Sequence, residues 1–298
     1  MSLYSLLGAL EIGLIFSLVA LGVLISFRIL NFPDLTVDGS FPLGGAVAAT
    51  LIAAGHDPFL ATACAIVAGA IAGFITGWLN VRLKIMDLLA SILMMIALYS
   101  INLRVMGAPN VPLISGSTVF TMIQPAWLPD YVLRPLALFV VVLAAKFGVD
   151  GFFSSQYGLA LRATGANPRM ARAQGIATGR ATLAGMALSN ALVALAGALF
   201  AQTQGGSDIS MGIGTIVIGL AAVIIGESIL PARRLMLTTL AAVLGAILYR
   251  FFIALALNSD FIGLKAQDLN LVTAVLVTIA LVLPATRKKL FGRKNGRA

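Results

Sequence analysis

Long apolar runs fill most of the chain, and short polar stretches separate them. Nine runs are close to the roughly 20 residues that an α-helix needs to cross a bilayer: 3–25, 40–54, 59–79, 88–105, 132–147, 182–202, 211–230, 235–257 and 269–284. They are continuous, without the two-residue alternation of barrel strands, so they predict helices. We predict an all-α polytopic membrane protein with about nine helices, roughly 8 to 10, because the runs at 40–54 and 132–147 are short.

The composition agrees with a membrane protein and excludes several other classes. Of the 298 residues, 60% are hydrophobic and 10% are charged, whereas soluble domains carry about 25% charged residues. One cysteine, Cys64, excludes an internal disulfide, and one histidine, His56, leaves no metal-ligand cluster. The net charge of +9 would suggest a nucleic-acid partner in a soluble protein. Here we expect none, because the basic residues follow the membrane topology.

Sixteen of the twenty basic residues fall on one side of the predicted membrane, in alternate loops and in the tail. In membrane proteins, the loops on the cytoplasmic side carry an excess of Lys and Arg. We therefore predict an outside N-terminus and a cytoplasmic C-terminus, with residues 1–286 as one transmembrane domain. Residues 287–298 form a basic cytoplasmic tail, which we expect to lie near anionic membrane lipid.

Two segments are too irregular for plain spans. Residues 31–45, NFPDLTVDGSFPLGG, hold two prolines, three glycines and two aspartates. Such backbone survives at membrane depth only when it is buried in protein or lines a water-filled path. A glycine-rich segment at 207–226 is similar in kind, which suggests an inverted repeat. We predict substrate-path residues among the polar side chains of the first segment and of one later span: Asn31, Asp34, Asp38, Ser40 and Asn190. The alternatives are that the aspartates cap helices and that Asn190 makes an interhelical hydrogen bond.

Gly69, Gly73 and Gly77 form two successive GxxxG units on one face of the run at 59–79. Glycines at this spacing let a second helix approach closely. We predict that the neighbour is a helix of the same chain; an oligomer contact is the alternative.

The stretch at 157–176 carries three arginines and no acid. Asn167 can cap a helix, Pro168 suits its first position, and Gly175 can take the left-handed conformation that ends it. This predicts a helix of about seven residues, roughly 10 Å long, in a cytoplasmic loop at 148–180. It is too short to cross the bilayer, so it indicates a contact surface. The chain has no GxxxxGK[ST], HExxH or GxSxG motif, so we expect no enzyme and no cofactor bound by this chain.

That stretch, YGLALRATGANPRMARAQGI, resembles the coupling-loop signature of the ABC importer permeases for branched-chain amino acids and ribose. Residues 34–49, DLTVDGSFPLGGAVAA, and residues 219–248 are similar to two further segments of the family, in the same order. Within the family, VDGSFPLGG resembles the branch associated with tryptophan- or tyrosine-type amino acid uptake. One departure is Glu227, which stands where relatives tend to carry a second glycine.

The resemblance implies a permease subunit of an ATP-driven importer in the bacterial inner (plasma) membrane. Its partners would be two ABC ATPase subunits carrying ATP-Mg, a periplasmic binding protein that delivers a small polar solute, and a second permease copy in a homodimer. The solute would be an amino acid, possibly an aromatic one. The short helix would dock on the ATPase through the following residues: Arg162, Ala163, Asn167, Pro168, Arg169, Met170, Ala171, Arg172, Ala173 and Gly175. Composition and topology alone leave open a secondary transporter or channel with no ATPase partner.

Overall fold

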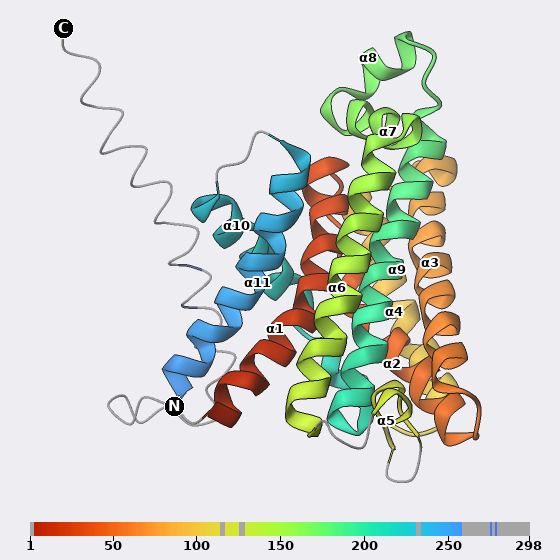
Figure 1. Ribbon diagram of the computed structural model, residues 1–298. Coiled ribbons are helices and arrows are strands. Elements are labelled where there is room, and N and C mark those ends of the chain that lie inside the picture. Colours follow the sequence, from red (N-terminus) through yellow and green to blue (C-terminus); the bar gives the residue numbers. More distant parts are fainter. Residues whose placement is uncertain are drawn as a thin grey trace, which may run out of the picture.

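Helices form nearly all of the described chain, which comprises residues 3–113, 117–124, 129–230, 234–257, 275 and 278 of a computed structural model (Figure 1). Seven of them are long and apolar enough to cross a membrane. They are α1 (Leu3–Val23) continued by the π-helix η1 (Leu24–Ile29), α3 (Pro58–Leu83), α4 (Asp87–Met106), α6 (Asp130–Ser154), α9 (Thr178–Gln204), α10 (Thr215–Ile229) with the preceding 3₁₀ turn η2 (Ile209–Gly212), and α11 (Leu235–Leu257).

The remaining elements are short. An apolar helix of 17 residues, α2, covers Val37–Ala53. The others are α5 (Val119–Ile123), α7 (Gln156–Ala166), α8 (Pro168–Ala173) and two strands, β1 (Asn110–Pro112) and β2 (Gly206–Asp208). The strands pair antiparallel, with Val111 opposite Ser207.

Eight of the nine predicted runs are helical, and the ninth, at 269–284, lies outside the described residues, as does the tail. The count of nine spans is therefore not confirmed. The prediction that the run at 132–147 is short was wrong, because α6 continues to Ser154. The added residues include Asp150, which forms an ion pair with Lys146 one turn earlier on the same helix.

The core lies around α1, α2 and α9. Phe16 of α1 stacks on Phe41 of α2 with ring centroids 5.8 Å apart, and Phe41 lies 5.5 Å from Phe200 of α9. Most of α1 and α9 is buried inside the chain, whereas α3, α4 and α6 expose much of their apolar surface. Exposed apolar surface of this extent on spanning helices fits contact with lipid.

The glycine face of α3 packs against α9 of the same chain, as predicted. A Cβ atom at Gly69 or Gly73 would overlap the backbone or side chains of α9, and one at Gly77 would lie 3.3 Å from Leu183. The three glycines thus let the two backbones meet closely.

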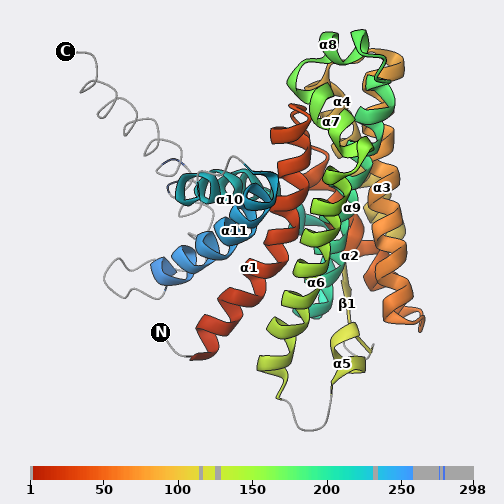
Figure 2. The same cartoon turned by 45° about the horizontal axis from the view of Figure 1, so that its top comes forward.

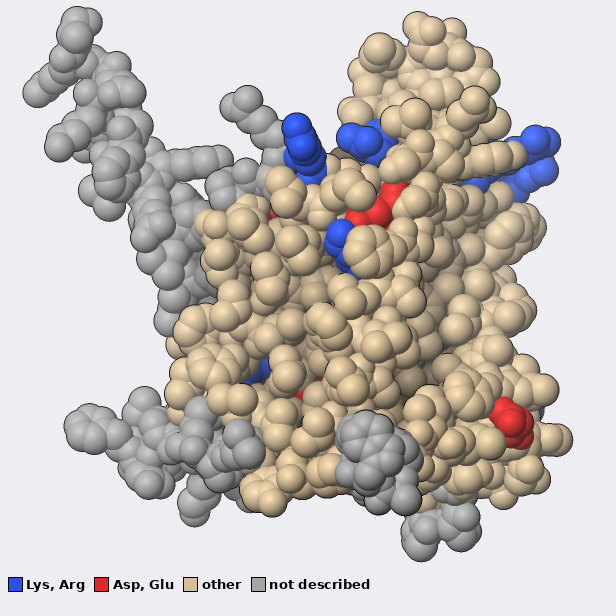
Figure 3. All heavy atoms as spheres, viewed as in Figure 1, with Lys and Arg blue, Asp and Glu red and all other residues tan. Residues whose placement is uncertain are grey.

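Figures 1 and 2 show α7 and α8 together at one end of the bundle. The N-terminus of α1 and the short elements β1 and α5 lie toward the other end. On the face in Figure 3, most Lys and Arg side chains gather toward the end that carries α7 and α8. This arrangement agrees with a basic cytoplasmic end.

Candidate functional site

The short helix α8 begins and ends as its sequence predicts. The side-chain oxygen of Asn167 accepts hydrogen bonds of 3.1 Å from the backbone N–H groups of Arg169 and Met170. Pro168 occupies the first helical position. At the C-terminal end, Gly175 adopts the left-handed conformation, with a φ of +81°. The Ile176 N–H donates a 3.0 Å hydrogen bond to the Ala171 carbonyl, as is typical of a helix end with a left-handed glycine. The conformation of α8 is thus fixed by its own sequence.

Most predicted docking residues of this loop point to solvent, with Ala171 as the clear exception. Ala171 is only 2% exposed, and its predicted docking role stays a prediction. Met170, by contrast, is 62% exposed. The other predicted residues are exposed or, for Ala163, half-buried. Within the described residues, the arginines of α7 and α8 form no ion pair.

Sequence reasoning missed the helix α7, which supports α8. Its first turn is capped by the Ser155 hydroxyl, which accepts a 3.3 Å hydrogen bond from the Gly158 N–H. Leu161 is buried, and a Cβ at Gly165 would overlap the Ile29 carbonyl. The end of α7 therefore lies against the end of η1. The signal available in the sequence was Ser155, a residue type that caps helices, directly before the run at 156–166.

A cleft of about 940 Å³ lies beside α8 and draws its walls from the ends of several helices. Its lining includes Lys84 at the end of α3, Arg172 of α8 and Asn31 after η1. Asn31 and Lys84 are the two non-glycine residues with positive φ in the described chain, each at +55°. The Arg172 guanidinium also donates a 3.2 Å hydrogen bond to the Thr178 hydroxyl at the start of α9.

Three of the predicted substrate-path residues meet in a buried polar cluster. The Asn190 amide donates to Asp34 across 2.8 Å and accepts from the Ser40 hydroxyl across 2.7 Å. All three side chains are buried completely. Beside them, the hydroxyls of Thr36 and Thr76 share a hydrogen bond of 2.9 Å. The cluster joins the 31–45 segment to α9 and α3.

Asp38 and Asn31 lie outside this cluster. The Asp38 carboxylate accepts hydrogen bonds from the N–H groups of Gly214 and Ile216, at 3.3 and 2.8 Å, and so caps the start of α10. Asn31 lines the cleft beside α8. The two irregular segments, 31–45 and 207–226, are thus in direct contact, which the sequence did not indicate. The inverted repeat suggested by their similarity stays a prediction.

These contacts are those of the structural alternatives, a helix cap and an interhelical hydrogen bond. Asp34, Ser40 and Asn190 have no exposed surface, so they cannot touch a solute in this conformation, whereas Asp38 is partly exposed. A role of Asp34, Asp38, Ser40 or Asn190 in the substrate path therefore stays a prediction.

Glu227, where the chain departs from the family pattern, pairs with Arg28 of η1. The Arg28 Nε lies 2.8 Å from the Glu227 carboxylate, and the two side chains are 65% and 32% exposed. Among the described residues, no three His, Cys, Asp or Glu side chains gather as a metal site would require.

Residues 5–283 match the family described as the permease component of branched-chain amino acid transport systems. The chain belongs to this family. The permease is a multi-pass protein of the inner membrane and a member of a family of transporters, not of enzymes.

Individual relatives differ in the solute that their names carry. The permease is 38% identical over 266 residues to the tyrosine transport system permease protein of Clostridioides difficile (strain R20291), across 89% of this chain and 86% of that protein. It is 32% identical over 187 residues to the nucleoside ABC transporter permease protein NupC of Lactococcus lactis subsp. cremoris (strain MG1363), across 59% of this chain and 53% of the relative.

The fold has a solved counterpart. PsaBC from Streptococcus pneumoniae, in a complex with Fab, aligns with a TM-score of 0.53 over 93% of this chain and 89% of that one. At 16% identity, this likeness shows the fold alone.

Proposed function

We propose that the permease is the membrane subunit of an ATP-driven ABC importer for a small polar solute, with an amino acid as the favoured class. The observation that carries the proposal is α8. It is a capped, basic helix of six residues that lies at the end of the bundle and leaves its arginines without ion pairs in the described chain. Such a helix offers cations and an exposed methionine to an acidic, partly apolar groove on a partner.

The proposed partner on this face is a pair of ABC ATPase subunits, which bind ATP-Mg. ATP binding would favour one arrangement of the two ATPases, and rigid contacts through α8 would shift the permease between inward-open and outward-open states. α8 suits that task because α7 connects it to α6 and packs against η1, so that a displacement of α8 would be transmitted to the spanning helices.

A second copy of the permease would complete the pore, as a homodimer. In one copy, the polar cluster around Asp34 and Asn190 is enclosed by α2, α3 and α9. A water-filled path between two copies needs no opening through this packed interior. A binding protein on the far side would deliver the solute.

For the solute, we favour an amino acid with an aromatic side chain. The support is the 38% identity to a tyrosine transport system permease over most of both chains. The match to a nucleoside transporter permease covers less of either chain. The discriminating measurement is competition for uptake among tyrosine, tryptophan, leucine and a nucleoside.

Co-purification tests the partnership directly. The permease should isolate with an ABC ATPase, and the ATP hydrolysis of the complex should rise when liganded binding protein is added. Arg172→Glu should reduce both, because it reverses one charge on the docking face while the caps of α8 stay intact. Wild-type association and stimulation in this variant would count against that face.

The second candidate is a secondary transporter or channel that uses the same bundle without an ATPase. Its distinguishing property is uptake by the permease alone in vesicles that hold an ion gradient and no ATPase. The proposed importer predicts no uptake there.

A further inference from the structure

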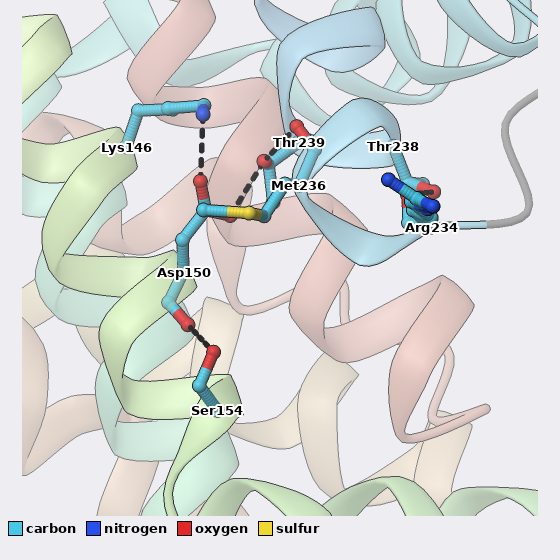
Figure 4. A network of polar contacts seen from close by, with 7 residues as sticks. All are labelled: Lys146, Asp150, Ser154, Arg234, Met236, Thr238 and Thr239. Carbon is cyan, nitrogen blue, oxygen red and sulfur yellow. Dashed lines mark hydrogen bonds and ion pairs between the residues drawn. The ribbon is translucent and has the colours of Figure 1, made fainter.

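Lys146, Asp150 and Thr239 form a charged cluster where α6 meets α11 (Figure 4). The Lys146 Nζ lies 2.7 Å from Oδ2 of Asp150, and the Thr239 hydroxyl donates a 2.7 Å hydrogen bond to Oδ1 of Asp150. The three residues are 8%, 2% and 0% exposed, respectively. The cluster is separate from α8 and from the polar cluster around Asp34.

Stability alone does not explain such a cluster. Removing two charges from water costs about as much as their attraction returns, so a buried ion pair adds little over apolar residues of the same size. Ionisable side chains within spanning helices are costly, and they mark functional positions more often than structural ones.

The position of Asp150 connects the coupling region to the rest of the bundle. Asp150 lies one helical turn before Ser154, where α6 ends, and its carbonyl accepts a 2.7 Å hydrogen bond from the Ser154 hydroxyl. The chain then enters α7 and α8. On the other side, Thr239 lies one turn into α11, which packs against α1 and α10.

We propose that Asp150 is a positioning residue for transport, through which movement of α7 and α8 reaches α11. The hydrogen bond from Thr239 is the link, because a bond to a carboxylate is short, directional and stronger than one between neutral groups. Lys146 compensates the buried charge of the carboxylate. This inference rests on the proposed function, since it requires that α8 be moved by an ATPase.

The test compares Thr239→Val with Thr238→Val in the permease–ATPase complex, reconstituted with binding protein in lipid vesicles. Valine has nearly the shape of threonine and leaves the Lys146–Asp150 pair in place. We expect Thr239→Val to lower the amount of tyrosine, the probe used, that is transported per ATP hydrolysed by about fivefold, with wild-type ATPase co-purification. Thr239→Ser, which keeps the hydroxyl, should restore the wild-type ratio.

Thr238 provides the matched control. It is the next residue on α11, and its hydroxyl donates at 3.3 Å to the Arg234 carbonyl of the turn before it, away from α6 (Figure 4). Thr238→Val should keep the wild-type ratio. A wild-type ratio in Thr239→Val, or an equal fall in both variants, would overturn the inference. A lower melting temperature with an unchanged ratio would also overturn it, because that result indicates a purely structural bond.

A second variant covers the case in which Thr239→Val does not fold. The double variant Lys146→Met with Asp150→Leu removes both charges together and takes away the acceptor of Thr239. Replacing a buried pair with apolar residues usually preserves folding. We expect the same loss of transport per ATP, and a wild-type ratio would refute the link. If the wild-type complex shows no ATP-driven uptake at all, the proposed function fails, and that result is distinct from either outcome.

Discussion

Replacing Asn190 with leucine should destabilise the permease far more than the same change at Asn102. Asn190 makes three hydrogen bonds, to Asp34, to Ser40 and to the Met186 carbonyl. Asn102 makes one, to the Gly39 carbonyl, and its own side-chain oxygen has no partner. Both side chains are almost fully buried, at 0% and 1% exposed. The pair therefore isolates the number of hydrogen bonds from burial and size.

The magnitudes follow from the bonds that are lost. Hydrogen bonds between membrane helices contribute about 0.6 kcal/mol on average, and bonds to a charged group contribute about 1.5–3 kcal/mol. Asn190→Leu should therefore cost about 2–4 kcal/mol, including the unpaired Asp34 and Ser40 groups that remain. Asn102→Leu should cost about 0–1 kcal/mol, since it also removes an unsatisfied oxygen.

The assay is thermal unfolding of the purified permease in lipid nanodiscs. At about 2 °C per kcal/mol for a chain of this size, the melting temperature should fall by about 4–8 °C for Asn190→Leu and by about 2 °C or less for Asn102→Leu. An equal fall in the two variants, or a larger fall for Asn102→Leu, would refute the reasoning. In that case the polar cluster would not hold α2 to α9.

Three further changes test other parts of the account. Gly175→Val should abolish ATPase co-purification while the permease still inserts. Gly55 also has a positive φ, of +85°, but lies far from α8, so Gly55→Val should introduce similar backbone strain and leave co-purification unchanged. Gly73→Ala should lower unfolding free energy by about 1–3 kcal/mol through overpacking against α9, whereas Gly148→Ala, with nothing within 4 Å, should be neutral or stabilising in an unfolding scan. Glu227→Gln breaks a half-exposed ion pair with η1, so its cost should stay below about 1 kcal/mol and shrink in high salt.

Local features of the sequence predicted α8 in detail. Asn167, Pro168 and Gly175 act on their own helix, so their roles follow from residues within one short stretch. The spacing of glycines on one face of α3 predicted the close approach of a helix of the same chain, but not that this helix is α9.

Features that depend on distant residues were not predictable in this way. Asp38 caps α10, whose first residue lies more than 170 positions later in the chain, and nothing near Asp38 specifies that contact. The predicted run ended at residue 147, before Asp150, and nothing near Asp150 in the sequence specifies that Lys146 and Thr239 of α11 satisfy its carboxylate. Features set by residues within one stretch were predictable, whereas the identity of a distant partner residue was not.

The most direct test of the central claim is uptake into vesicles that contain the purified permease, its ATPase and the binding protein, with ATP supplied to the ATPase side. The account predicts that uptake requires ATP hydrolysis, stops when the ATPase is inactivated, and does not respond to ion gradients. Uptake by the permease alone, driven by an ion gradient, would contradict it.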